Sequence, residues 1–214
     1  MTRVYLEVGK RRVFASAADW PGWTRSGKDE KSALAALAAA APRYAQAAKA
    51  ARIPFAPGTT LDVVERLPGD ATTEFGAPGA IAKAESKRLT KKEAGRLSAL
   101  VAASWTVLDG VVEKAPSALR KGPRGGGRDR DKIVEHVLGA ETMYARKLGL
   151  RLQQPPAGDS AAVREFRNAI VAGLRAGTKG VTEHGWPARY AARRMAWHVL
   201  DHAWEIEDRS TQQL

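Results

Sequence analysis

The chain contains 214 residues, of which 44% are hydrophobic and 27% are charged, a composition that excludes a wholly disordered protein. It has no cysteine, so disulfide bonds, cysteine-ligated zinc and a protein thiol nucleophile are excluded. The formal net charge is +12, but residues 1–75 carry 11 basic and 8 acidic side chains, and residues 76–214 carry 24 and 15. The densest basic stretch is Arg120–Lys132, and the basic residues elsewhere are scattered along the chain. This distribution favours a solvated basic surface over a dedicated nucleic-acid site, which stays open as an alternative.

The chain shows no membrane or export signal at the level of its sequence pattern. No apolar run approaches the roughly 20 residues that a membrane span needs. The N-terminus is charged from residue 3 and lacks the apolar core of a secretory signal. We therefore expect a soluble, cytoplasmic protein.

The first part of the chain has the pattern of a small α/β unit. Gly9-Lys10 lies between two β-rich runs and predicts a hairpin, and Trp20-Pro21-Gly22-Trp23 predicts a further turn. An alanine-rich helix follows, which we expect Pro42 to kink or split. The predicted order is strand, strand, strand, helix and strand, at residues 2–8, 12–18, 23–26, 29–51 and 60–67.

The second part changes to a helical period after a stretch rich in proline and glycine. Four helices are predicted, the first from about Glu85 to Pro116 and the others over residues 129–148, 159–176 and 187–208. Helices of this length with short links predict a four-helix bundle. The expected class is α+β: a β-β-β-α-β domain over residues 1–75, a linker over 76–84, and an up-down-up-down all-α bundle over 85–214.

The histidines are the residues with the clearest chemistry. The chain has four, and two of them, His198 and His202, form an H-x-x-x-H pair on the last predicted helix. A spacing of four places both imidazoles on one face, one turn apart, so that they can chelate one metal ion. His136 is on the second helix of the bundle and can supply a third ligand, the number that a catalytic zinc site usually takes from protein.

The positions of these three histidines leave two interpretations open. On helical wheels, His136, His198 and His202 all lie at the margin of the apolar arc of their helix. A ligand at the mouth of a cleft belongs there, and so does a half-buried histidine with only a packing role. The fourth, His184, is predicted on a loop and is interpreted as a non-ligand.

Two further elements are weaker candidates. A glycine-rich basic loop, residues 121–128, precedes a helix, and Arg124 or Arg128 can hold a substrate carboxylate or thiol if the loop overhangs the metal. A flexible basic linker with Asp129 as helix cap is the alternative interpretation. Glu205 follows His202 by three residues and can orient its imidazole, or act as a surface ion-pair partner.

Residues 85–208 resemble the DinB/YfiT-like superfamily of four-helix bundles. The resemblance depends on Asp131-Lys132-Ile133-Val134-Glu135-His136 and on the segment Ala196-Trp197-His198-Val199-Leu200-Asp201-His202-Ala203-Trp204-Glu205. The family binds zinc or nickel through three histidines, which implies His136, His198 and His202 as ligands here. Its members include thiol-dependent enzymes that use bacillithiol or mycothiol, which implies a thiol-dependent transferase or isomerase acting on a small electrophile.

Residues 3–66 resemble a HicB-type, antitoxin-like domain. The resembling residues are Ala18-Asp19-Trp20-Pro21-Gly22-Trp23 and the following segment from Ser26 to Leu34. Trp23 and Lys31-Ser32 depart from the family pattern, and no DNA-binding tail is visible. The resemblance implies a recognition or dimerisation module.

Three functions remain open from the sequence. The first is a metal- and thiol-dependent enzyme, with mycothiol as the implied thiol and a homodimer as a possible assembly. The second is a non-catalytic binding module with an RNA or protein partner, for which the basic stretch Arg120–Lys132 would be the contact surface. The third is a metal-binding bundle without activity.

Overall fold

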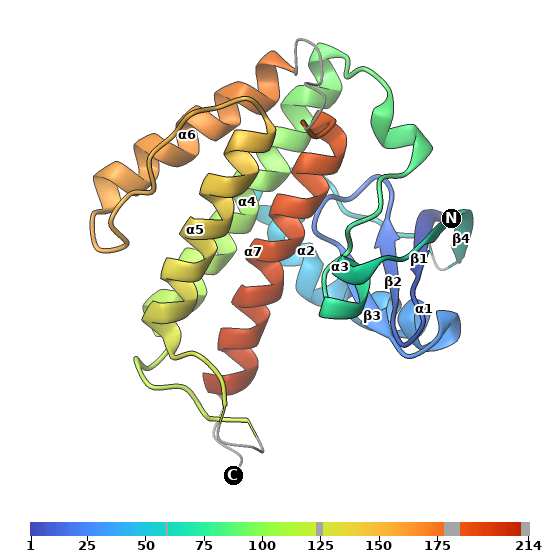
Figure 1. Cartoon of the computed structure of the whole chain (residues 1–214), viewed down its shortest axis with the longest axis horizontal. Coiled ribbons are helices and arrows are strands. Elements are labelled where there is room, and N and C mark those ends of the chain that lie inside the picture. The colour runs from blue at the N-terminus through green and yellow to red at the C-terminus, as the bar shows by residue number, and fades with distance from the viewer. Residues whose placement is uncertain (59, 123–125, 178–184, 211–214) are drawn as a thin grey trace.

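The computed structural model describes residues 1–58, 60–122, 126–177 and 185–210 (Figure 1). It combines a four-stranded mixed sheet, ordered β3-β2-β1-β4, with helices, so the expected α+β class is confirmed. The strands are β1 Thr2–Val8, β2 Val13–Ala17, β3 Thr24–Gly27 and β4 Leu61–Pro68.

The sheet begins with the predicted hairpin. β1 and β2 are antiparallel with Val8 opposite Val13, whereas β4 runs parallel to β1 and is reached through a helical crossover. β4 contains one extra residue, Val64, because Val4 pairs with Val63 and Tyr5 pairs with Glu65. Because of this bulge, Val63 and Glu65 of β4 pair with consecutive residues of β1, whose side chains point to opposite faces of the sheet.

Two short helices form that crossover and cover one face of the sheet. They are α1 Glu30–Ala39 and α2 Ala41–Ala50. Asp29 caps α1 by accepting a hydrogen bond from Ser32 N at 2.7 Å. Pro42 lies in the first turn of α2, where its missing N–H is tolerated, so the expected helix is split at Ala40.

The core under these helices extends into the last helix of the chain, α7 (Ala188–Ser210). Trp23 Nε1 donates a hydrogen bond to Leu37 O at 2.8 Å, and the Trp23 ring stacks on the Tyr44 ring. The Tyr44 hydroxyl donates to Pro21 O at 2.9 Å. Leu200 and Trp204 of α7 belong to the same core. The N-terminal sheet and the last helix therefore share buried surface.

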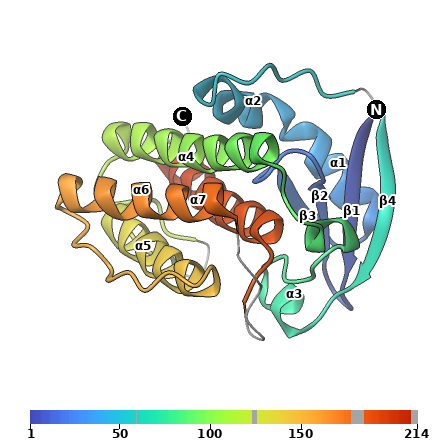
Figure 2. The same cartoon turned by 90° about the horizontal axis from the view of Figure 1, so that it is seen from above.

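The other face of the sheet is covered by the segment between β4 and the long helices (Figure 2). It contains a short helix α3 (Ala71–Phe75) and a 3-10 turn η1 (Lys83–Ser86), neither of which was predicted. The buried Glu7 carboxylate accepts hydrogen bonds from Thr73 Oγ1 at 2.5 Å and from the backbone N–H groups of Gly79 and Ala80 at 2.9 Å. Residues 71–80 are thus fixed on the sheet.

Four long helices make up the rest of the described chain. They are α4 Lys91–Lys114, α5 Arg130–Lys147, α6 Ser160–Ala176 and α7. α7 packs against both α4 and α5, and α6 packs against α4 (Figures 1 and 2). α5, α6 and α7 begin and end within two residues of their predicted limits. α4 begins later than predicted, because Thr90 and Glu93 form a capping box there, with Thr90 N donating to Glu93 Oε2 at 2.8 Å.

Among the described residues, α4 is the one helix long and apolar enough, by length and composition, to cross a membrane. Its best window of 18 residues has a mean hydropathy of 1.2, and 44% of that window is buried. α2, α6 and α7 all pack against it, as they would against a core helix.

A buried carboxyl group lies between α4, α5 and α6. Glu141 Oε1 accepts a hydrogen bond from Trp105 Nε1 at 2.6 Å, and its Oε2 lies 3.6 Å from Arg167 Nε. Arg167 also binds Asp109 at 3.0 Å. Burial raises the pKa of Glu141 from 4.5 to about 7, although Arg167 and Trp105 oppose this shift.

This raised pKa predicts a measurable pH dependence. Between pH 4.5 and 7 the folded protein holds a proton on Glu141 that the unfolded chain releases, so this group lowers stability as the pH rises. Through this group, the free energy of unfolding of wild type should fall by about 3 kcal/mol between pH 4.5 and 7. We expect Glu141→Gln, which mimics the protonated form, to remove this fall. Urea unfolding across this range checks it. The histidines titrate in both proteins, so their contribution cancels when the unfolding free energy of the variant is subtracted from that of wild type. A subtracted value that does not change with pH would contradict the prediction.

Candidate metal centre

The fold brings together the three histidines singled out in the sequence. His136 is on α5, and His198 and His202 are on α7, which packs against α5. One ring nitrogen from each lies within 4.8 Å of the other two. The ring centroids are 4.6 to 5.1 Å apart, and His198 Nε2 is 3.3 Å from His136 Nε2.

The separation of these two nitrogens suits a shared ion. Zinc–imidazole bonds are about 2.0–2.1 Å long, so two nitrogens on a tetrahedral zinc are about 3.3 Å apart. The donor set is three imidazoles from two helices, with no carboxylate or thiolate among them. Such a set suits zinc or nickel and leaves at least one coordination position for a small molecule.

Electrostatics favours the form of these histidines that binds metal. Burial lowers the pKa of His198 well below its ordinary value of 6.5, and His202 and His136 lower it further. Burial and then His202 also lower the pKa of His136. A lowered pKa means that the imidazole stays neutral at physiological pH, so its lone pair is available.

Glu205 fixes the orientation of His202. Its Oε2 lies 2.8 Å from His202 Nδ1, and its Oε1 accepts a hydrogen bond from Arg209 at 2.7 Å. The hydrogen bond to His202 lowers the pKa of Glu205, so the carboxylate is ionised and can only accept. Since the carboxylate can only accept, this contact favours the His202 tautomer that donates from Nδ1 and presents the Nε2 lone pair to a metal.

Aromatic rings form the wall behind His198, which is 8% exposed. The Tyr144 ring stands perpendicular to the imidazole at 5.7 Å between centroids, and the Trp197 ring lies at 6.1 Å. His198 Nδ1 is buried without a hydrogen-bond partner in the described part of the chain. His136 and His202 are half-buried, so the centre is open on their side.

Of the two arginines predicted to hold a substrate, the structure describes Arg128 only. Arg128 is exposed, and its charge contributes to the lowered pKa values of His136 and His198, so it lies near the centre. Arg124 lies outside the described residues, as does His184. Lys121, in the same loop, is paired with Asp129 at 2.6 Å.

Two arginines near the centre, Arg25 and Arg194, were not expected from the sequence. Arg25 of β3 pairs with Asp201 at 3.2 Å, directly beside His202. Arg194 lies one turn before His198 on α7 and packs on both Tyr144 and Trp197. The i to i+4 spacing of Arg194 and His198 was visible in the sequence, whereas the contact of β3 with α7 was not.

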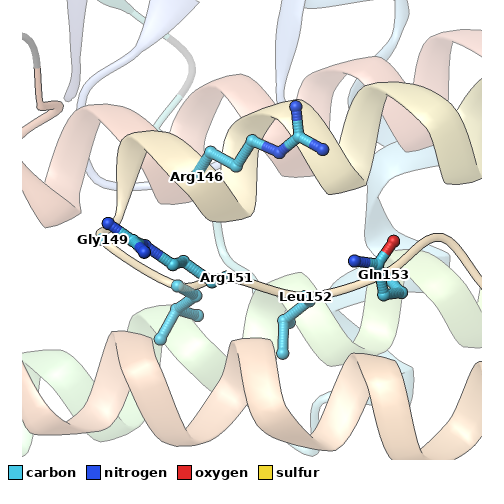
Figure 3. A pocket seen from close by; sticks show the side chains of 6 residues that line it. Arg146, Gly149, Arg151, Leu152 and Gln153 are labelled. Carbon is cyan, nitrogen blue, oxygen red and sulfur yellow. The ribbon is translucent and has the colours of Figure 1, made fainter.

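Two cavities lie away from the histidines. One of about 600 Å³ is lined by Arg146 at the end of α5 and by residues 149–153 of the following segment (Figure 3). Another of about 520 Å³ lies between α2, α4 and α7 and is lined by Gln46, Val107, Gly110, Lys114 and neighbouring residues. None of the three histidines lines either cavity.

Comparisons with protein-family models, curated proteins and solved structures give no match for this chain.

Proposed function

We propose that His136, His198 and His202 hold one divalent metal ion, zinc or nickel. The observation that carries this proposal is the convergence of three ring nitrogens within 4.8 Å from helices that are far apart in the sequence. The lowered pKa values of two of these histidines and the Glu205 contact to the third support it.

The chemistry proposed for the site is activation of a thiol or a water molecule. A metal with an open coordination position lowers the pKa of a bound thiol or water and makes it a nucleophile at neutral pH. Because the chain has no cysteine, the thiol would be a small molecule of the mycothiol class. We propose a transferase or isomerase that acts on a small electrophile.

The four long helices are proposed to be a DinB-like four-helix bundle, with the centre on its α5–α7 seam. The N-terminal sheet is proposed to be a HicB-like recognition module. Its docking on α7 through Leu200, Trp204 and the Arg25–Asp201 pair supports a role beside the metal centre. The proposed location is the cytoplasm.

The second candidate, a module that binds RNA or protein through Arg120–Lys132, has less support. Lys121 pairs with Asp129, Arg130 with Asp131, and Lys132 with Glu135. These pairs compensate part of the positive charge that a nucleic-acid contact would use.

The proposal is tested by measuring the metal content of protein purified without a histidine tag, by plasma mass spectrometry. We expect close to one equivalent of zinc or nickel, and a higher melting temperature when metal is restored after chelation. A thiol-transferase assay with mycothiol follows. Absence of metal together with no stabilisation by zinc or nickel would contradict the proposal and favour the binding module.

A further inference from the structure

The guanidinium of Arg194 is buried next to the three histidines. Arg194 is 8% exposed and lies one turn before His198 on α7. Its Cζ is 4.9 Å from the Trp197 ring centroid and 5.8 Å from that of Tyr144, the two rings that also pack on His198. The cation and the candidate metal ligand therefore share one aromatic wall.

Arg194 differs from the other buried arginines of the described chain in its partners. Arg193, its neighbour, forms a two-pronged ion pair with Glu85 at 2.6 and 2.9 Å. Arg167 pairs with Asp109 and lies beside Glu141. Arg194 has no carboxylate within 4.0 Å among the described residues: its Nη1 donates to Pro78 O at 3.1 Å, and its Nε is buried without a partner.

The buried carboxylates of this region are already engaged. The Glu85 carboxylate accepts hydrogen bonds from Arg193 and from the backbone N–H of Ala82. The Glu7 carboxylate accepts them from the Thr73 hydroxyl and from the backbone N–H groups of Gly79 and Ala80. They compensate the charge of Arg194 only from a distance. Burial of a guanidinium without a contacting anion is unfavourable, and a divalent ion at the histidines would repel it further. The fold supplies a carboxylate to Arg193 but none to Arg194, so the charge of Arg194 has no contacting anion within the described residues.

We propose that Arg194 is the binding site for an anionic oxygen group, a carboxylate or a group of the same chemistry, on the small molecule that the metal centre acts on. This inference rests on the proposed function, because Arg194 lies one turn from the proposed metal ligand His198 and packs on the same two rings. The substrate class is therefore a small anionic molecule with a second, metal-binding group. Arginine suits this role because its planar fork binds carboxylates with two hydrogen bonds.

The test uses two thiols that differ in one group. Full-length protein is loaded with Co²⁺, whose absorption reports thiolate binding, and is titrated with 3-mercaptopropionate and with neutral 2-mercaptoethanol. We expect the carboxylate-bearing thiol to bind wild type about tenfold or more tightly than the neutral one, the scale of a hydrogen bond to a charged group. Arg194→Gln should abolish this preference without changing cobalt stoichiometry or mercaptoethanol affinity. Arg164→Gln, an exposed arginine of α6, is the matched control and should keep it.

The outcomes separate this inference from the metal proposal. Stoichiometric cobalt with equal affinity for the two thiols, or a preference that Arg194→Gln retains, overturns the anion site and leaves the metal site standing. If no cobalt binds, the metal proposal fails, and stabilisation of metal-free protein by inorganic phosphate decides the anion site. If phosphate raises the melting temperature of wild type but not that of Arg194→Gln, the anion site is supported. If phosphate does not raise the melting temperature of wild type, the site is overturned. If Arg194→Gln does not fold, Arg194→Lys replaces it. This variant keeps the positive charge but loses the planar fork, so it should reduce the preference for the carboxylate-bearing thiol, and an unchanged preference overturns the anion site.

Discussion

Replacing His198 with alanine is expected to reduce bound metal from near one equivalent to background. His198 is the most buried of the three histidines, and its Nε2 lies 3.3 Å from that of His136. Without it, two half-buried imidazoles remain, fewer than the three protein ligands of most catalytic zinc sites. Zinc at roughly 100 times its dissociation constant adds about 2.7 kcal/mol to wild-type stability. For a protein of this size that is an increase of about 5–10 °C in melting temperature, which the variant should lack.

Two controls separate loss of a ligand from loss of the fold. His202→Ala removes a less buried ligand and should give the same loss of metal, with a smaller effect on the stability of metal-free protein. His184→Ala changes the histidine interpreted as a non-ligand and should retain both metal and stabilisation. Equal metal content in wild type and His198→Ala would show that any bound ion lies elsewhere.

Replacing Glu85 with glutamine is expected to destabilise the protein by about 3–5 kcal/mol, the range found when one partner of a buried ion pair is removed. The Glu85 and Arg193 side chains are each 5% exposed, and Arg193 Nη2 also donates to Ala80 O at 2.8 Å. The variant leaves the arginine charge buried between η1 and α7 without its carboxylate. Urea or thermal unfolding of metal-free protein measures the effect.

A surface pair provides the matched control. Arg66 and Glu30 form an ion pair of similar geometry at 3.0 Å, but both side chains are well exposed. Glu30→Gln should therefore cost about 1 kcal/mol or less. The double variant Glu85→Leu/Arg193→Met, which removes both charges, should recover most of the loss. Similar costs at the two sites would mean that the buried pair is not an important link between η1 and α7.

The sequence determined much of the local structure by itself. Hydrophobic periodicity and the position of Pro42 predicted the long helices and the split between α1 and α2, and Gly9-Lys10 predicted the hairpin. These signals act within a few residues, so they need no knowledge of the rest of the fold. The spacing of His198 and His202 belongs to the same class, since four residues of helix place them on one face.

The tertiary structure decided how those pieces meet. The contact of His136 with the α7 pair depends on the packing of α5 against α7, which no local spacing specifies. Arg193 is buried against a carboxylate, Glu85, whereas Arg194 is buried against a backbone carbonyl, that of Pro78. This difference depends on where residues 78–85 lie across α7. Desolvation and charge pairing depend on distances between segments far apart in the chain, so they become definite only when the whole fold is formed.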